Sequence, residues 1–193
     1  MREDILRAAE ELLATRAPSE ISLREIARHG GFQHSLITRH FGTKDDLMAE
    51  VLQRTLRAYA DAVRDADDPI DGFMRGLDHV ATHPASFQAM ARALMDRRGT
   101  ASDDGPFTAF EIHRERLERN RPGAADGFDL DVLTVALMAL TTGWAFNEDR
   151  WLRRAGFRDG DRDRVRERLA ELIGLLVEHH APTESQAEIK RSS

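Results

Sequence analysis

The chain has 193 residues, with 28 Lys and Arg against 34 Asp and Glu, which gives a formal net charge of −6. A hydrophobic content of 41% is enough for a substantial core, so the composition indicates a soluble globular protein. The sequence contains no cysteine, which excludes disulfides, thiolate metal sites and a cysteine nucleophile. The acidic balance disfavours broad attraction to nucleic acid, because phosphate repels an acidic molecule.

Apolar residues recur at three- and four-residue spacing along the chain, and alternating runs typical of strands are absent. This pattern predicts an all-α protein of about nine helices. The first helix is expected around residues 5–13 and a pair of short helices within residues 22–44. The later helices are expected over residues 47–65, from Pro69, and over 85–96, 106–120, 129–154 and 161–180. Polar connectors are expected at 99–105 and 121–127, and the tail from residue 181 is expected to fray.

Residues 22–30 predict the first helix of the pair. Ser22 and Glu25 have the spacing of a capping box, in which each side chain bonds the other residue's amide. Leu23, Ile26 and Ala27 share an inward face, while Arg24 and Arg28 lie on the opposite side. Gly30 and Gly31 then supply the positive φ that a sharp reversal needs.

The second helix of the pair is expected to begin near Gln33. If Ile37 and Phe41 face the core, helical periodicity turns Ser35, Thr38 and Arg39 outward. Thr43 then caps the next helix, where Lys44 and free amides suit a phosphate. Four cations and one acid give residues 22–44 a local charge of +3 before histidines are counted. Two helices fixed by a glycine turn are a common way to present a helix to the DNA major groove.

Three segments together carry a family resemblance: Ile5-Leu6-x-Ala8-Ala9-x-x-Leu12-Leu13, Ile26-Ala27-x-x-Gly30-Gly31-Phe32 and Arg39-His40-Phe41-Gly42-Thr43-Lys44-Asp45-Asp46-Leu47. Their combination, over about a quarter of the chain, resembles the DNA-binding domain of the tetracycline-repressor (TetR-like) family of bacterial transcriptional regulators. The resemblance implies a three-helix helix-turn-helix DNA-binding domain over 1–46 and a helical ligand-binding and dimerisation domain over 47–180, followed by a disordered tail over 181–193.

The resemblance also implies a set of DNA contacts on the helix pair and the start of the next helix. Two positions depart from the family pattern, since Thr38 stands where a tyrosine is usual and Gln33 where a serine or threonine usually caps the recognition helix. Base preference therefore cannot be borrowed from relatives. The expected DNA-contacting residues are Ser22, Arg24, Gln33, His34, Ser35, Thr38, Arg39, His40 and Lys44.

The last two predicted helices indicate self-association. Residues 130–146 are apolar almost all round, which in a soluble protein means burial on more than one side. The last helix has an apolar seam spaced like a bundle interface, comprising Val165, Leu169, Leu172, Ile173, Leu176 and Val177. We expect both helices to pair with a second copy, because a symmetric dimer presents two recognition helices to an inverted-repeat operator.

The middle helices are the expected sensor for a small-molecule effector. Aromatic and methionine residues could line an apolar cavity there, with a few polar side chains as handles. For each residue alone, plain core packing is the competing interpretation. The candidate ligand-binding residues are Phe73, Leu77, Phe87, Met90, Phe110, His113, Thr141 and Trp144.

The sequence predicts no enzyme, no cofactor and no metal site. His79 and His83 have a chelating spacing, but a third ligand is not evident, and no nucleophile, acid–base pair or phosphate loop appears. The apolar run at 130–146 is shorter than a bilayer span and the N-terminus begins with a charged amphipathic helix, so we expect a cytoplasmic protein without membrane contact. The predicted function is a ligand-responsive DNA-binding repressor. The alternative is an all-α ligand-binding or adaptor protein of the same fold that does not bind DNA.

Overall fold

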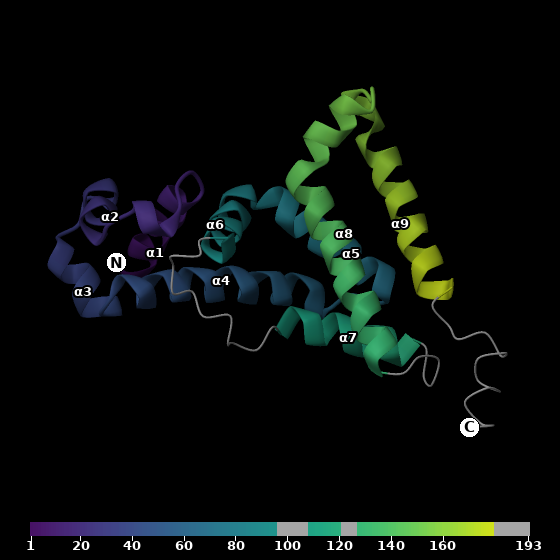
Figure 1. Ribbon diagram of the computed structural model, residues 1–193, viewed down its shortest axis with the longest axis horizontal. Coiled ribbons are helices and arrows are strands. Elements are labelled where there is room, and N and C mark those ends of the chain that lie inside the picture. The colour runs from purple at the N-terminus through teal and green to yellow at the C-terminus, as the bar shows by residue number, and fades with distance from the viewer. Residues whose placement is uncertain (96–107, 121–126, 180–193) are drawn as a thin grey trace. The chain divides into compact units, whose positions relative to one another are not determined.

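The computed structural model describes residues 1–95, 108–120 and 127–179. Within these ranges the chain forms nine α-helices and two short 3-10 helices and no strand, which confirms the all-α prediction (Figure 1). The elements are α1 (Arg2–Leu13), η1 (Pro18–Glu20), α2 (Leu23–Gly30), α3 (His34–Phe41), α4 (Lys44–Arg64), α5 (Pro69–Thr82), α6 (Pro84–Met95), α7 (Thr108–Asn120), α8 (Gly127–Arg154), η2 (Asp159–Asp161) and α9 (Arg162–His179). The predicted connector at 99–105, most of the one at 121–127 and the tail from 181 lie outside the described residues.

Local signals set the helix starts. Pro69 is the first residue of α5, where the missing amide costs no hydrogen bond, and Asp68 Oδ1 accepts from the Asp71 amide at 2.9 Å. Pro84 is likewise the first residue of α6, so this helix begins one residue before the predicted Ala85. Both prolines fit the first turn of a helix because its amides have no intrahelical partner.

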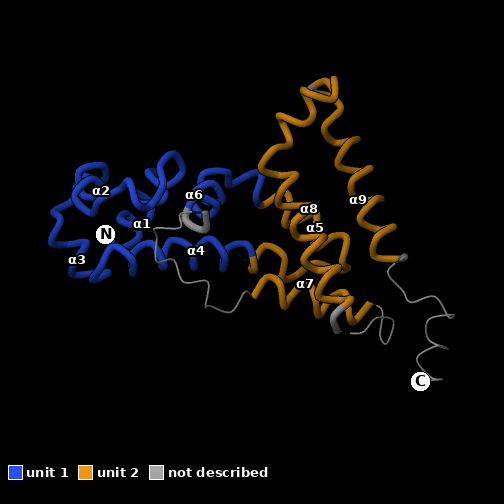
Figure 2. Tube along the Cα trace, viewed as in Figure 1, with its two compact units in different colours: residues 1–59, 80–107 blue, residues 60–79, 108–193 orange. Residues whose placement is uncertain are grey.

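The chain divides into two compact units (Figure 2). Unit 1 comprises residues 1–59 and 80–107, and unit 2 comprises residues 60–79 and 108–193. These units do not coincide with the domain boundary expected after residue 46, because α6 and most of α4 pack in the same unit as α1. Arg92 Nε of α6 donates to the Ala14 carbonyl at 3.1 Å, and the Ser86 hydroxyl donates to Glu10. The division into 1–46, 47–180 and 181–193 remains a prediction about function.

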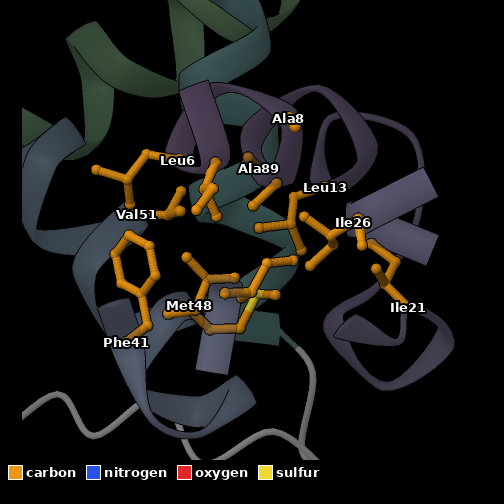
Figure 3. Packing of buried hydrophobic residues seen from close by; sticks show 14 residues of the cluster. Leu6, Ala8, Leu13, Ile21, Ile26, Phe41, Met48, Val51 and Ala89 are labelled. Atoms are coloured by element: carbon orange, nitrogen blue, oxygen red, sulfur yellow. The ribbon is translucent and has the colours of Figure 1, made fainter. Parts of the chain in front are cut away.

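Unit 1 has one continuous hydrophobic core, built from α1, α2, α3, the first half of α4 and α6 (Figure 3). α1 packs against α2, α3 and α6, so it is the central support of the two short helices. Neither α2 nor α3 is long enough to be stable alone, since isolated helices below about 12 residues are marginal in water. Their orientation therefore depends on core residues that include Ile5, Leu13, Ile26, Ile37 and Leu47.

Unit 2 contains the last turn of α4, most of α5, and α7, α8 and α9. Its buried side chains include Phe73, Leu77, Leu117, Leu137 and Ile173. A polar cluster joins α8 to α9 around the buried carboxylate of Glu148. This carboxylate accepts from Arg162 Nη1 at 2.6 Å, from Arg166 Nη2 at 2.7 Å and from Trp144 Nε1 at 3.2 Å. Although burial alone would raise the pKa of Glu148, these donors hold it below its ordinary value.

The predicted seam of α9 separates into two faces. Leu169, Ile173 and Val177 are buried within the unit, whereas Leu172 and Leu176 are about half exposed, at 56% and 48%. Residues four apart share a helix face, so the two sets point in different directions. Only the first set is needed to pack α9 within its own chain. The second set is an apolar face that the single chain leaves in solvent.

α8 also has an uncovered apolar face. Val132, Val135 and Leu140 are exposed, beside exposed Ala136 and Ala139. For this reason the segment Asp129–Ala155 is, by length and composition alone, apolar enough to cross a bilayer, the one such helix in the described ranges. The expectation that this region is too short for a span considered only the run at 130–146. The full helix is longer, and it includes the buried Glu148 that binds α9.

Candidate nucleic-acid interface

α2 begins with the predicted capping box. The Glu25 amide donates to Ser22 Oγ at 3.3 Å, and the Ser22 amide donates to Glu25 Oε2 at 2.8 Å. The Ser22 backbone and hydroxyl, together with Arg16 Nη1 at 3.1 Å, lower the pKa of Glu25 from 4.5 to about 2. Glu25 is thus ionised across the physiological range and committed to its own helix. As predicted, Ile26 and Ala27 are buried while Arg24 and Arg28 are exposed.

The turn between α2 and α3 uses its two glycines for different reasons. Gly31 has φ 73°, in the left-handed region, and its amide donates to the Ala27 carbonyl. Gly30 is the last helical residue and does not have positive φ, which corrects the prediction that both glycines supply it. A Cβ on Gly30 would lie 2.0 Å from the ring of Phe32. The turn therefore needs Gly30 for close approach and Gly31 for its backbone conformation.

α3 presents the predicted outward face. Ile37 and Phe41 are buried in the core of unit 1, while Ser35, Thr38 and Arg39 are exposed. The remaining predicted contact residues are also accessible: Ser22, Arg24, Gln33 and His34 are exposed, and His40 and Lys44 are half-buried. Gln33 is the N-cap and makes no side-chain capping bond, as its departure from the family pattern predicts. Thus the start of α3 depends on its packing, because no side chain satisfies its first amides.

The start of α4 lies directly after α3. Gly42 turns the chain with φ 80°, and its amide donates to the Thr38 carbonyl at 2.8 Å. Thr43 Oγ1 then accepts from the Asp46 amide, and Asp46 Oδ2 accepts from the Thr43 amide, each at 3.1 Å. These bonds confirm Thr43 as the cap. They also occupy the amides of Thr43 and Asp46, so these two amides are not free for a phosphate.

The charges on this surface are not neutralised by the protein. In the described part of the chain, Arg24, Arg28, Arg39 and Lys44 have no carboxylate within ion-pair distance. Acids near them are engaged elsewhere, as Glu25 is by Arg16. The surface formed by α2, α3 and the start of α4 is therefore locally cationic on a chain whose net charge is −6. An exposed polar and basic second helix, fixed by a glycine turn, defines a helix-turn-helix protein with a nucleic-acid-binding face.

Comparisons with known proteins match the N-terminal helices to one family of regulators. Residues 5–51 match the model described as bacterial regulatory proteins, tetR family. An HTH-type transcriptional repressor of Mycobacterium tuberculosis (strain ATCC 25618 / H37Rv) is 29% identical over 178 residues, which covers 91% of this chain and 88% of the relative. The N-terminal quarter of the chain thus matches the tetR family of bacterial regulatory proteins, which confirms the resemblance that its motifs indicate.

Solved structures show the same fold. A putative transcriptional regulator from Streptomyces coelicolor has a TM-score of 0.70 at 19% identity and covers 94% of this chain and 98% of its own. The TetR-family regulator PfmR from Thermus thermophilus has a TM-score of 0.64 at 19% identity and covers 90% and 95%. AibR, solved with isovaleryl coenzyme A and operator DNA, has a TM-score of 0.61 at 14% identity and covers 89% and 97%.

The candidate ligand-binding residues do not all belong to one unit. Phe87 and Met90 lie in unit 1, where the Phe87 ring meets Tyr59 edge-on at 5.9 Å. The other six lie in unit 2: Phe73, Leu77, His113 and Thr141 are buried, and Phe110 and Trp144 are half-buried.

Two of the candidates in unit 2, one expected as a polar handle and one as an aromatic lining residue, are engaged by neighbouring groups of the protein. The hydroxyl of the handle Thr141 donates to the Leu137 carbonyl at 2.9 Å, and Nε1 of the lining residue Trp144 donates to Glu148. His113, another expected handle, stacks on Phe73 with ring centroids 4.2 Å apart. The ligand-binding set remains a prediction, with His113 as its most distinctive polar member.

Sequence reasoning assigned no role to Arg116, a buried polar residue of unit 2. Arg116 lies on α7 and is 3% exposed. It lies three residues after His113 and one before the buried Leu117, on the side of α7 that helical periodicity turns inward. The sequence signal that could have revealed its burial is an arginine at a position where helical periodicity predicts an apolar residue.

Proposed function

We propose that this protein is a homodimeric transcriptional repressor that binds an inverted-repeat operator through α3 and releases it when a small-molecule effector binds the C-terminal helices. The observation that carries the proposal is the exposed, cationic face of α3, whose buried face is fixed in the core of unit 1. Family membership supports regulation, and the M. tuberculosis relative is named a repressor.

DNA recognition divides between two kinds of contact. Ser35, Thr38 and Arg39 are placed to reach base edges, because they lie on the exposed side of the second helix. Arg24 and Lys44 flank this helix and suit phosphates. Thr38 can donate to a phosphate or touch a thymine methyl, which are smaller contacts than a tyrosine would make. We therefore expect an operator preference specific to this chain.

Dimerisation through α8 and α9 supplies the second recognition helix. Both helices have exposed apolar faces that the single chain leaves uncovered, with alanines on α8 that allow close approach of a partner helix. Removing such area from water is favourable by roughly 25 cal/mol per Å². The proposed two-fold pairing would also account for the apolar length of α8 without a membrane, in keeping with a cytoplasmic protein. The two recognition helices of such a dimer would read half-sites about 34–36 Å apart, or a multiple of this.

Release by an effector follows from linkage. An effector that binds better to the dimer arrangement with the lower DNA affinity must weaken DNA binding by the same factor. No residue of the described ranges forms a recognisable catalytic set, so the bundle is proposed to bind its ligand without changing it.

A salt-titrated gel shift with DNA flanking the protein's own coding region tests this function. We expect a retarded complex that resists non-specific competitor and weakens steeply with salt, because several cations meet phosphates. Binding that is equal for all DNA fragments, or absent for all of them, would instead favour the alternative protein without an operator.

Substitution on the reading face tests the assignment of residues. Arg39→Ala should lower operator affinity by about 5- to 150-fold, the usual range for loss of a specific contact. Arg150→Ala on α8, which removes an equally exposed arginine from unit 2, is the matched control and should leave affinity unchanged. Equal affinities for the wild type and Arg39→Ala in a footprinting titration would remove α3 from the proposed interface.

Substitution on α9 tests the dimer. Leu172→Asp places a charge on the exposed apolar face and should convert the dimer to monomer in sedimentation velocity. Phe157→Asp makes the same chemical change at a similarly exposed residue in the connection between α8 and α9, and should leave the dimer intact. A Leu172→Asp protein that sediments as the wild-type dimer would exclude this face.

A further inference from the structure

Arg116 is a buried cation that holds the end of α4. Its Nη2 donates to the carbonyl of Val63 at 2.7 Å and to that of Arg64 at 2.9 Å. These are the last two residues of α4, whose final carbonyls have no partner within the helix. The guanidinium therefore acts as a C-terminal cap supplied by α7. Positive charge is favourable at this end of a helix because of the helix dipole.

The charge of Arg116 has no acidic partner. No carboxylate in the described part of the chain lies within ion-pair distance of its guanidinium, and Nη1 is buried without a hydrogen bond. Asp71, the acid with the largest electrostatic effect on Arg116, is engaged by Arg75 at 2.9 Å. Burial lowers the pKa of Arg116, and the like charge of Arg119 lowers it further. A buried charge with one nitrogen left without a hydrogen bond is costly, and an anionic ligand at Nη1 would offset that cost.

Gly72 and His113 lie next to the unbonded Nη1 of Arg116. A Cβ on Gly72 would lie 2.5 Å from Arg116 Nη1 and 3.5 Å from His113 Nδ1. Gly72 of α5 thus leaves the space that the guanidinium occupies, and His113 presents a ring nitrogen to the same point. The His113 ring stacks almost parallel on Phe73, at 6° between planes, which fixes its orientation. Two nitrogen groups from α7 therefore converge over one glycine of α5.

We propose that Arg116 and His113 bind the carboxylate of the effector, an amphipathic carboxylic acid whose apolar part packs against α7. This inference rests on the proposed function and names the chemical class of its ligand. A carboxylate fits because it brings one negative charge and two oxygens to one guanidinium nitrogen and one imidazole. A phosphate would bring more charge and more acceptor oxygens than this pair of groups can satisfy. Phe73, which stacks on His113, is buried and apolar, as are Leu77 of α5 and Leu117 of α7, and such residues suit a hydrocarbon chain.

The same guanidinium connects the ligand site to α4. Because Phe73, Leu77 and His113 are fully buried, a ligand reaches Nη1 only when α5 and α7 separate. That separation moves the arginine that caps α4 at Val63 and Arg64. α4 is one continuous helix whose first half contributes Leu47 and Val51 to the core of the DNA-reading unit. Carboxylate binding at Arg116 and the position of α4 are thereby linked.

Thermal unfolding of the full-length protein with defined probes tests the ligand class. The probes are octanoate, decanoate and phenylacetate, each compared with its neutral primary amide at the same concentration. We expect at least one carboxylate to raise Tm in a concentration-dependent manner while its amide does not, because only the ionised group pairs with Arg116. A failure of all three carboxylates, or equal stabilisation by the amides, would overturn the proposal.

Variants locate the binding. Arg116→Gln should weaken the carboxylate that stabilises the wild type by about tenfold or more, since it removes a charge-assisted bond. Gly72→Ala, which places a methyl group 2.5 Å from Nη1, should have the same effect without removing the arginine. Arg150→Gln, which removes an exposed arginine of α8 in the same unit, is the control and should bind as the wild type. Unchanged carboxylate affinity in a folded Gly72→Ala protein would place the ligand elsewhere.

The DNA assay separates this inference from the function on which it rests. The stabilising carboxylate should release the wild-type protein from its operator, whereas Gly72→Ala should bind DNA and resist release. If carboxylates stabilise the protein but no fragment is shifted, the ligand class stands and the repressor function fails. If the operator is bound but carboxylates neither stabilise nor release the protein, the repressor function stands and the ligand class fails.

Discussion

Acidification from about pH 7.5 to about pH 5 should destabilise this protein through His113. This histidine is 1% exposed, stacks on Phe73 and lies beside the Arg116 guanidinium. Burial lowers the pKa of His113 from 6.5 to about 4, and the charge of Arg116 contributes to the shift. The native state therefore disfavours the imidazolium, whereas the unfolded chain accepts a proton with the ordinary pKa.

The sign and size of the effect follow from these two values. Between pH 6.5 and about pH 4 the unfolded state binds the proton and the native state does not, so stability falls as the pH falls. Above about pH 6.5 His113 is largely neutral in both states, so the stability that depends on the neutral imidazole is fully present. At about pH 5 the loss amounts to about 2 kcal/mol, and below about pH 4 it reaches a limit of about 3 kcal/mol.

Urea unfolding at both pH values measures this loss. The wild type should lose about 2 kcal/mol more than His113→Gln between about pH 7.5 and pH 5, because the variant has no imidazole to protonate. Protein concentration must be held constant, since dimerisation contributes to apparent stability. The Asp and Glu side chains also make stability depend on pH, but they are the same in both proteins, so their contribution cancels in the difference. Identical pH dependence in the wild type and the variant would show that His113 does not titrate as its environment predicts.

Three further substitutions test the supports of the site by urea unfolding. Gly30→Ala should destabilise unit 1 by about 1–3 kcal/mol, because its Cβ would lie 2.0 Å from the Phe32 ring; an unchanged midpoint would refute the close approach. Ser22→Ala should cost about 1 kcal/mol through loss of the α2 cap, and a neutral result would show that the cap is redundant. Glu148→Gln should cost about 3 kcal/mol, since it leaves two arginines around a buried amide; a fully stable variant would contradict the buried ion cluster.

Much of the DNA-binding part of unit 1 could be predicted from local sequence signals. The cap at Ser22, the reversal at Gly31 and the cap at Thr43 depend on side chains and backbones within four residues of each other. Helical periodicity likewise identified the exposed side of α3, because Ile37 and Phe41 are the apolar residues of this short helix that face the core. Such short-range interactions can be read from sequence, since their geometry is fixed by helix spacing alone.

The sensor region could be predicted less well. Candidates were chosen by residue type, and aromatic residues at helical spacing occur in any core. The periodicity of α9 indicated one seam, but two faces are apolar, and sequence does not reveal which of them a neighbouring helix covers. Thr141 was expected as a polar handle and Trp144 as a lining residue, yet their donors are engaged by Leu137 and Glu148, within four residues of each.

The sequence by itself therefore determined the helices, their caps, the glycine turn and the family resemblance of the N-terminal helices, because these depend on neighbours along the chain. Only the tertiary structure decided that Arg116 is buried and that its guanidinium meets the end of α4 and Gly72. Those partners are distant in sequence, and the cost of burying a charge depends on which groups surround it in space.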